Sequence, residues 1–89
     1  MKARVTIELE FEDDNFDESI FVDLTSDVEY ALRGYDVTDT AKEYYVSYPI
    51  WNAKEYSIKE NAAIENYIDR HIEELEDLFI EKFERDEIN

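Results

Sequence analysis

The strictest pattern in this chain is an alternation of apolar and polar residues near its start. Ala3, Val5, Ile7, Leu9 and Phe11 alternate with Arg4, Thr6, Glu8, Glu10 and Glu12. A period of two is typical of a β-strand that buries one face in a core and exposes the other to solvent. The pattern therefore predicts a half-buried strand whose solvent face carries three carboxylates in succession.

Further strand patterns follow the first. A polar stretch at 13–18 separates it from a second apolar alternation at 19–24, and this spacing predicts an antiparallel hairpin. Residues 42–48 return to strand character and end at Pro49, the only proline in the chain. Because residues 53–57 are a candidate for a short fourth strand, we expect a small antiparallel sheet of three to four strands.

Two capping boxes, in which a serine precedes a glutamate by three residues, predict the starts of two helices. The segment Ser26–Glu29 opens a short helix over about 26–33, and Gly34 stands where a left-handed C-cap is expected. The segment Ser57–Glu60 opens a long C-terminal helix over about 58–86, in which apolar residues recur at spacings of three and four. This apolar stripe consists of Ile64, Ile68, Ile72, Leu75, Phe79 and Phe83.

Length and composition limit the classes of protein that this chain can belong to. Its 89 residues suffice for one small core, so we expect a single α+β domain over 1–89. The absence of cysteine excludes disulfides and cysteine nucleophiles, and a single histidine excludes a multi-histidine metal cluster. Since no serine lies in a nucleophile-elbow context, we expect neither an enzyme nor a bound cofactor or metal. No apolar run suits a signal peptide or a membrane span, so we expect a cytoplasmic protein.

The charge balance points to one kind of partner. Nine basic residues against 25 acidic ones give a net charge of −16 at pH 7. This charge opposes direct binding to nucleic acid, which needs Lys and Arg, and to anionic membranes. A hydrophobic content of 44% and an aromatic content of 15% separate the chain from disordered acidic tails. We therefore expect a folded acidic domain whose surface suits a basic partner.

Carboxylates of the predicted long helix form a row at i, i+4 spacing, and Glu76 and Glu84 fall in the same arc. The row consists of Glu65, Asp69, Glu73, Asp77 and Glu81. Like charges at this spacing cost about 0.2–0.5 kcal/mol per pair, so the row opposes helix stability. Successive carboxylates rise by about 6 Å, which is of the order of the phosphate spacing along a nucleic-acid strand. The row is therefore either a solvated face that keeps the protein soluble or a substitute for phosphates.

A second acidic zone, from Glu8 to Glu18, has seven acids in eleven residues and no basic residue. If the long helix packs on the sheet, the two zones would form two negative rows that resemble a duplex. The candidate partner-binding acids of this zone are Glu8, Glu10, Glu12, Asp13 and Asp14.

The turn in this zone also has a partial match to a calcium loop. Asp13, Asn15 and Asp17 occupy the first three ligand positions of an EF-hand. However, Glu18 and Leu24 stand where the loop needs glycine and a bidentate glutamate, so a hairpin turn is the simpler interpretation.

Tyrosines crowd the predicted strand at 42–48. If only one of its faces is buried, the period of two exposes either Tyr44 and Tyr48 or Tyr45. Because exposed tyrosines are frequent anchors at interfaces, Tyr45 is a further candidate partner-binding residue.

The whole layout resembles the small acidic inhibitors made by phages and mobile elements. These include anti-CRISPR and anti-restriction proteins, some of which mimic DNA. The resemblance is one of layout and composition: it rests on the row from Glu65 to Glu81 and the zone from Glu8 to Glu18, without a matching family motif. It implies a stoichiometric inhibitor, monomeric or homodimeric, that blocks the DNA or RNA site of a basic nucleic-acid-binding protein or nuclease in the host cell.

Two alternatives fit the same sequence. Immunity proteins of nuclease toxins are similar in size, charge and exposed tyrosines. A structural or assembly module, by contrast, would self-associate through the long helix, with Ile68, Leu75 and Phe79 at the contact.

Overall fold

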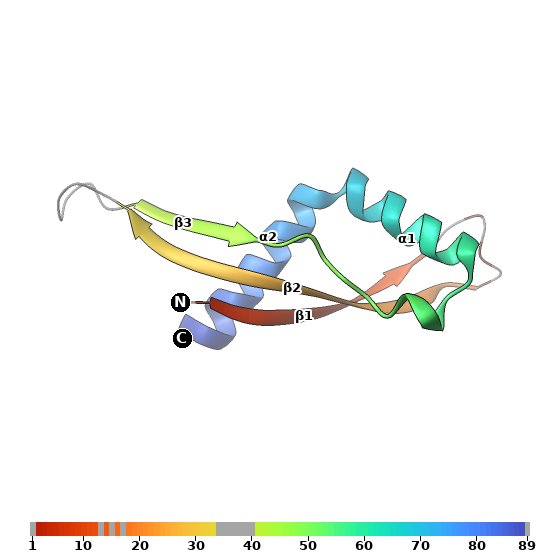
Figure 1. The fold of residues 1–89 in the computed structure, drawn as a ribbon, viewed down its shortest axis with the longest axis horizontal. Helices are drawn as coiled ribbons and strands as arrows, with labels where there is room; N and C mark the ends of the chain where they lie inside the picture. The colour runs from red at the N-terminus through yellow and green to blue at the C-terminus, as the bar shows by residue number, and fades with distance from the viewer. Residues whose placement is uncertain (1, 13, 15, 17, 34–40, 89) are drawn as a thin grey trace.

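The computed structural model is an α+β fold, in which two helices pack on one face of a three-stranded antiparallel sheet (Figure 1). The structure describes residues 2–12, 14, 16, 18–33 and 41–88. The strands, in the spatial order β1-β2-β3, are β1 Lys2–Phe11, β2 Ile20–Arg33 and β3 Ala41–Val46. The helices are α1 Ile58–Arg70 and α2 Ile72–Phe83, with a 3-10 turn η1 at Ala53–Glu55 and a π-helical turn η2 at Glu84–Ile88.

The predicted hairpin is confirmed, and its register decides which side chains face the helices. Thr6 pairs with Thr25, and Ile7 pairs with Leu24. Odd-numbered residues of β1 and even-numbered residues of β2 therefore point toward the helices. The remaining side chains of β1 and β2, together with Glu43 and Tyr45 of β3, point to the opposite face, here termed the outer face. No helix of the described residues covers the outer face (Figure 1).

The predicted helix over 26–33 is wrong, because β2 continues as a strand through this segment. Ser26 caps no helix: it is buried, and its hydroxyl donates a hydrogen bond to the carbonyl of Ser47 at 2.6 Å. Val28 continues the inward alternation of the hairpin and is fully buried. Pairing with strands on both sides satisfies the backbone better than an isolated two-turn helix does, so tertiary context overrides the local capping signal. The expected C-cap, Gly34, lies outside the described residues.

A β-bulge after β3 changes which side chains face outward. Val28 pairs with Val46, but Thr25 pairs with Ile50, so the β3 side holds one residue more than the facing stretch of β2. Without the extra residue, Ile50 would stand opposite Leu24 and point toward the core. With it, Ile50 shares the outer face with Thr25.

The helices also differ from expectation, because the predicted long helix is divided at His71. This residue has φ −121° and ψ 25°, outside the helical range, and the chain turns there (Figure 1). The capping box at the start of α1 is confirmed, since Ser57 and Glu60 exchange side-chain to backbone hydrogen bonds. Residues 53–57, the candidate fourth strand, contain η1 instead, so the described sheet has three strands.

The division at His71 lets the two helices cover different parts of the sheet. The ring of Tyr67 in α1 lies 4.7 Å from that of Phe11 at the end of β1. The ring of Phe83 in α2 lies 6.4 Å from that of Tyr44 in β3. A single straight helix over the predicted range would be about 40 Å long, and a twisted sheet would diverge from it at one end. The shape of the sheet therefore accounts for a break that no glycine or proline marks.

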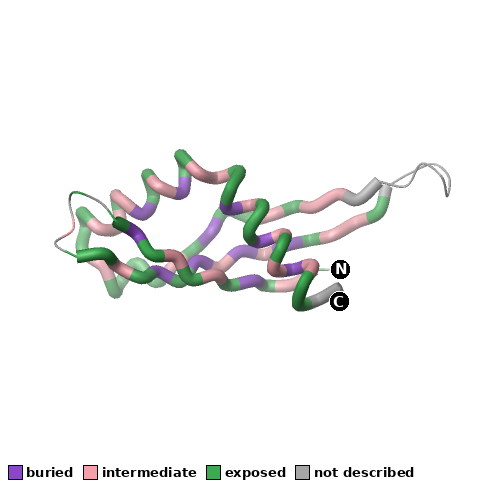
Figure 2. Tube along the Cα trace, turned by 180° about the vertical axis from the view of Figure 1, so that it is seen from behind, coloured by how far each residue is buried: buried purple, intermediate pink, exposed green. Residues whose placement is uncertain are grey.

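The core lies between the helices and the sheet, where the apolar stripe of the helices is buried (Figure 2). The predicted self-association face is wrong, because Ile68, Leu75 and Phe79 are buried within a single copy of the chain. Among the described residues, no helix has the length and apolar character needed to cross a membrane. The buried apolar side chains are Val5, Phe11, Val22, Leu24, Val28, Ile64, Ile68, Leu75, Phe79 and Phe83.

Candidate functional site

The outer face of the sheet carries two acids of the zone from Glu8 to Glu18, together with acids of β2 and β3. Six carboxylates of β1, β2 and β3 point to this face, and β1 contributes the cations Lys2 and Arg4 to it. The Nε of Arg4 lies 3.2 Å from Oδ1 of Asp27, so this cation is already paired. The outer-face carboxylates are Glu8, Glu10, Asp23, Asp27, Glu29 and Glu43.

The strand pairing places one acid of β1 opposite another acid. Glu8 stands directly opposite Asp23 on β2, and like charges in that position are destabilising. Glu10 accepts a hydrogen bond from the hydroxyl of Ser19 at 2.7 Å. Successive outward side chains on a strand are about 7 Å apart, so Glu8 and Glu10 present negative charge at nearly regular intervals. Glu12 and Asp14 are exposed beyond β1, and Asp13 lies outside the described residues.

The acids of the predicted row lie on the helices, and the break at His71 divides this row. Glu65 and Asp69 are on α1, whereas Glu73, Asp77 and Glu81 are on α2, which runs in a different direction (Figure 1). All five are exposed, whereas Glu76 is half-buried. Asp69 also accepts a hydrogen bond from the hydroxyl of Tyr48 at 2.9 Å. The row is therefore two shorter rows on two helices.

The two acidic zones face away from each other. The helices bury the odd-numbered side chains of β1, and the acids of β1 are even-numbered. The helical acids lie on the exposed side of α1 and α2, opposite the apolar stripe that contacts the sheet. Two negative rows on one common surface are thus not formed, because the sheet separates them.

The outer face also exposes apolar side chains that sequence reasoning missed. Phe21 is 60% exposed and Ile50 is 58% exposed, and the exposed fraction of Tyr45 on the same face is 47%. Phe21 could have been found from the alternation of β2, because it lies between the inward residues Ile20 and Val22. Ile50 could not, because its direction depends on the bulge. Tyr45 is exposed as one of the two predicted arrangements requires, but Tyr48 is 49% exposed as well, so the predicted alternation does not extend beyond β3, which ends at Val46. The Tyr45 hydroxyl donates to Glu43 at 2.6 Å.

Two tyrosines join the sheet side of the molecule to carboxylates on the helical side. The Tyr44 hydroxyl donates to Glu84, and this bond together with burial raises the pKa of Tyr44 to about 12. Burial and the hydrogen bond to Asp69 raise the pKa of Tyr48 to about 12. Burial also raises the pKa of Tyr56, whose hydroxyl donates to the carbonyl of Phe21. These hydroxyls therefore hold elements together in their protonated form.

We expect two tyrosines to titrate late in the folded protein. Tyr44 and Tyr48 should keep their protons above pH 10.0, the ordinary tyrosine value, up to about pH 12. The unfolded chain loses these protons earlier, so the free energy of unfolding should fall as the pH rises through this window. Tyrosinate absorbance should show one late-titrating group fewer in Tyr44→Phe and in Tyr48→Phe. The control Asp69→Asn should lower the pKa of Tyr48 alone, and a titration that none of these changes alters would contradict the assignment.

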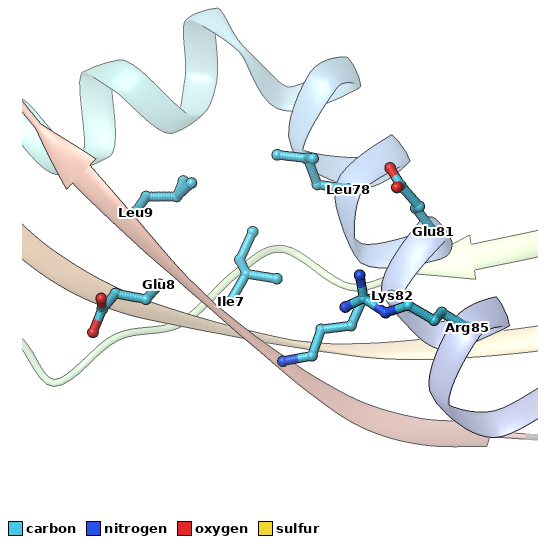
Figure 3. A pocket seen from close by; sticks show the side chains of 7 residues that line it. All are labelled: Ile7, Glu8, Leu9, Leu78, Glu81, Lys82 and Arg85. Carbon is cyan, nitrogen blue, oxygen red and sulfur yellow. The ribbon is translucent and has the colours of Figure 1, made fainter.

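The concavities of the surface are small. A groove between β1 and α2 is lined by Ile7, Leu9 and Leu78 together with four charged side chains, and encloses about 190 Å³ (Figure 3). Small-molecule sites usually measure about 300–1,000 Å³. Among the described residues, no group of three or more His, Asp or Glu side chains is placed to hold a metal ion. The candidate site is therefore a surface rather than a pocket.

The comparisons with known proteins leave this surface as the guide to function. No family model, no curated protein and no solved structure matches this chain.

Proposed function

We propose that this protein is a stoichiometric inhibitor that binds a basic nucleic-acid-binding protein or nuclease, of the anti-CRISPR or anti-restriction type. Its carboxylates take the place of nucleic-acid phosphates in the basic site of the target. The observation that supports this proposal most is the outer face, where six carboxylates stand on a sheet that no described helix covers, with the cations Lys2 and Arg4 on β1. Such a field attracts a basic groove over long range and speeds association.

The outer face suits this role better than the helical acids do. The strands place its acids on one broad surface, whereas the helical row is broken at His71 and Asp69 is engaged by Tyr48. The like-charge pair of Glu8 and Asp23 costs stability in the free protein. A basic partner between these two carboxylates would turn that repulsion into two attractive contacts.

The exposed apolar side chains supply the second part of a protein interface. Phe21, Ile50 and Tyr45 stand among the outer-face acids. Protein interfaces gain most of their affinity from a few aromatic or apolar anchors surrounded by polar residues. In this arrangement the acids steer the encounter, and the anchors slow dissociation.

The test is a capture experiment with two charge-neutralised variants. Tagged protein is incubated with nuclease-treated host lysate at low and moderate salt, and duplex DNA is added to compete with the retained protein. We expect a basic nucleic-acid-binding protein that DNA displaces and that moderate salt weakens. The variant Glu8→Gln/Glu10→Gln/Asp23→Asn should bind it at least about tenfold more weakly, the equivalent of about 1.4 kcal/mol.

The matched control removes the same number of charges from the helices. Glu73→Gln/Asp77→Asn/Glu81→Gln reduces the magnitude of the negative net charge equally but leaves the outer face intact. We expect this control to retain binding to within about threefold, because screening confines most of the effect to nearby charges. Retention that DNA does not reduce, or equal losses in both variants, would contradict a phosphate-like role of the outer face.

A further inference from the structure

The edge of β1 that faces away from β2 is a candidate site for pairing with another strand. β1 is an outer strand of the sheet and is ten residues long, and no described strand pairs with its other edge. Thr25 gives both of its backbone groups to Ile50, at 2.9 and 2.8 Å. Thr6, which stands opposite Thr25, therefore directs its own N–H and carbonyl away from β2.

The same alternation applies along the whole of β1. Every even-numbered residue from Lys2 to Glu10 directs its backbone groups to the free edge, while its side chain lies on the outer face. Lys82 shows that the edge accepts a donor, since its ammonium group donates to the carbonyl of Thr6. A long edge with regularly spaced backbone groups can pair with another strand.

The outward-pointing charges of β1 change sign at Thr6. Lys2 and Arg4 precede Thr6, and Glu8 and Glu10 follow it. In an antiparallel pair of two β1 strands centred on Thr6, Arg4, whose Nε also contacts Asp27 of its own copy, stands opposite Glu8 of the second copy. Lys2 stands opposite Glu10 of the second copy in the same register, and the two-fold axis repeats both pairs.

Other registers have less of this complementarity. Registers centred on Val5 or on Ile7 have one kind of opposite-charge pair instead of two. Centring the pair on Glu8 places two copies of Glu8 against each other, and centring it on Arg4 places two arginines together. Opposite charges directly across two strands stabilise the pair, and like charges destabilise it. The charge order of β1 therefore favours the register centred on Thr6, which has the most opposite-charge pairs and in which Val5 stands opposite Ile7 on the helix-covered side.

The groove beside β1 gives the second copy an apolar contact. Ile7, Leu9 and Leu78 line this groove, and Leu78 is 42% exposed (Figure 3). A strand added to the edge would cover these side chains on the helical side of the sheet. On the outer face, the added Arg4 would also approach Glu8, which faces the like charge of Asp23 in the single copy.

We propose that two copies of this chain pair antiparallel through the free edges of β1, with Thr6 on the two-fold axis. The two three-stranded sheets then form one continuous sheet with a continuous outer face. Lys82 must release the carbonyl of Thr6 for this pairing, so it opposes the dimer. The interaction does not depend on the proposed inhibitor function, because it involves no basic partner.

Sedimentation equilibrium of the full chain over a range of concentrations tests this dimer. At about 0.15 M salt the Debye length is about 8 Å, so the repulsion between two copies of charge −16 is screened while cross-strand pairs still act. We expect a reversible dimer that Glu8→Arg weakens about tenfold, because each Arg4 then meets an arginine. The same substitution places opposite charges at positions 8 and 23, so the single copy should be at least as stable.

Three further variants make the register falsifiable. Arg4→Glu/Glu8→Arg exchanges the charges within each pair and should restore dimerisation to within about threefold of the wild type. Thr6→Pro removes an N–H that points away from β2, so it should abolish the dimer while circular dichroism shows the fold intact. Lys82→Met should strengthen dimerisation. A chain that stays monomeric even with Lys82→Met, or a dimer that neither Glu8→Arg nor Thr6→Pro weakens, would overturn the proposal.

Discussion

Replacing Phe79 by alanine should lower the free energy of unfolding by about 3–5 kcal/mol. Phe79 is 0% exposed in α2 and belongs to the core between the helices and the sheet. Its removal leaves a cavity in a domain whose whole stability is of the order of 5–15 kcal/mol. Urea unfolding followed by circular dichroism measures the loss.

A matched control separates packing from the mere loss of an aromatic ring. Phe21→Ala makes the same chemical change at a side chain that is 60% exposed, so its effect should stay within about 0.5 kcal/mol. Equal losses for the two variants would show that α2 does not pack on the sheet as described.

Asp27→Pro should destabilise the protein by an amount on the order of 3 kcal/mol or more, the size of the proline effect on internal backbone hydrogen bonds in helices. The N–H of Asp27 donates to the hydroxyl of Ser47 at 2.8 Å, in the central strand of the sheet. Proline lacks this donor and does not fit between two paired strands. Thermal and urea unfolding measure the effect.

This substitution also distinguishes the strand from the helix that local signals predict. In a helix capped by Ser26, position 27 would be the first helical residue, where proline is favoured. Asp27→Asn is the control, because it removes the carboxylate that pairs with Arg4 but keeps the backbone donor. Full stability of Asp27→Pro would contradict the assignment of β2 beyond Ser26.

Periodic patterns allowed the correct prediction of several elements. The alternation from Ala3 to Phe11 predicted β1 and its buried face, because a period of two by itself separates the two sides of a strand. The box at Ser57 and Glu60 predicted the start of α1, because its hydrogen bonds are local. The apolar stripe predicted which side of the helices is buried.

Predictions failed where a distant contact competes with a local signal. The box at Ser26 is as good in sequence as the one at Ser57, but two neighbouring strands hold Ser26 in an extended backbone. The break at His71 has no glycine or proline to mark it, because it follows from the twist of the sheet beneath. The direction of Ile50 depends on one extra residue in the pairing with β2.

The candidate site, like the fold, could be predicted from the sequence only in part. The acids themselves and the exposure of most of them could be predicted, since charged side chains avoid the core. The grouping of the acids could not be predicted from the sequence. The row from Glu65 to Glu81 assumed one straight helix, and the comparison with a duplex assumed that both acidic zones lie on one surface. The structure places the outer-face acids and the helical acids on opposite sides of the sheet and adds Phe21 and Ile50 to the outer face.

The acidic surface, the half-buried strands and the buried helical stripe follow from composition and from the period of each element, so they can be read from the chain alone. The strand over residues 26–33, the break at His71 and the division of the acids between two faces arise only in the folded molecule. They depend on pairing and packing between residues far apart in the chain, and these contacts outweigh local preferences of about 1 kcal/mol.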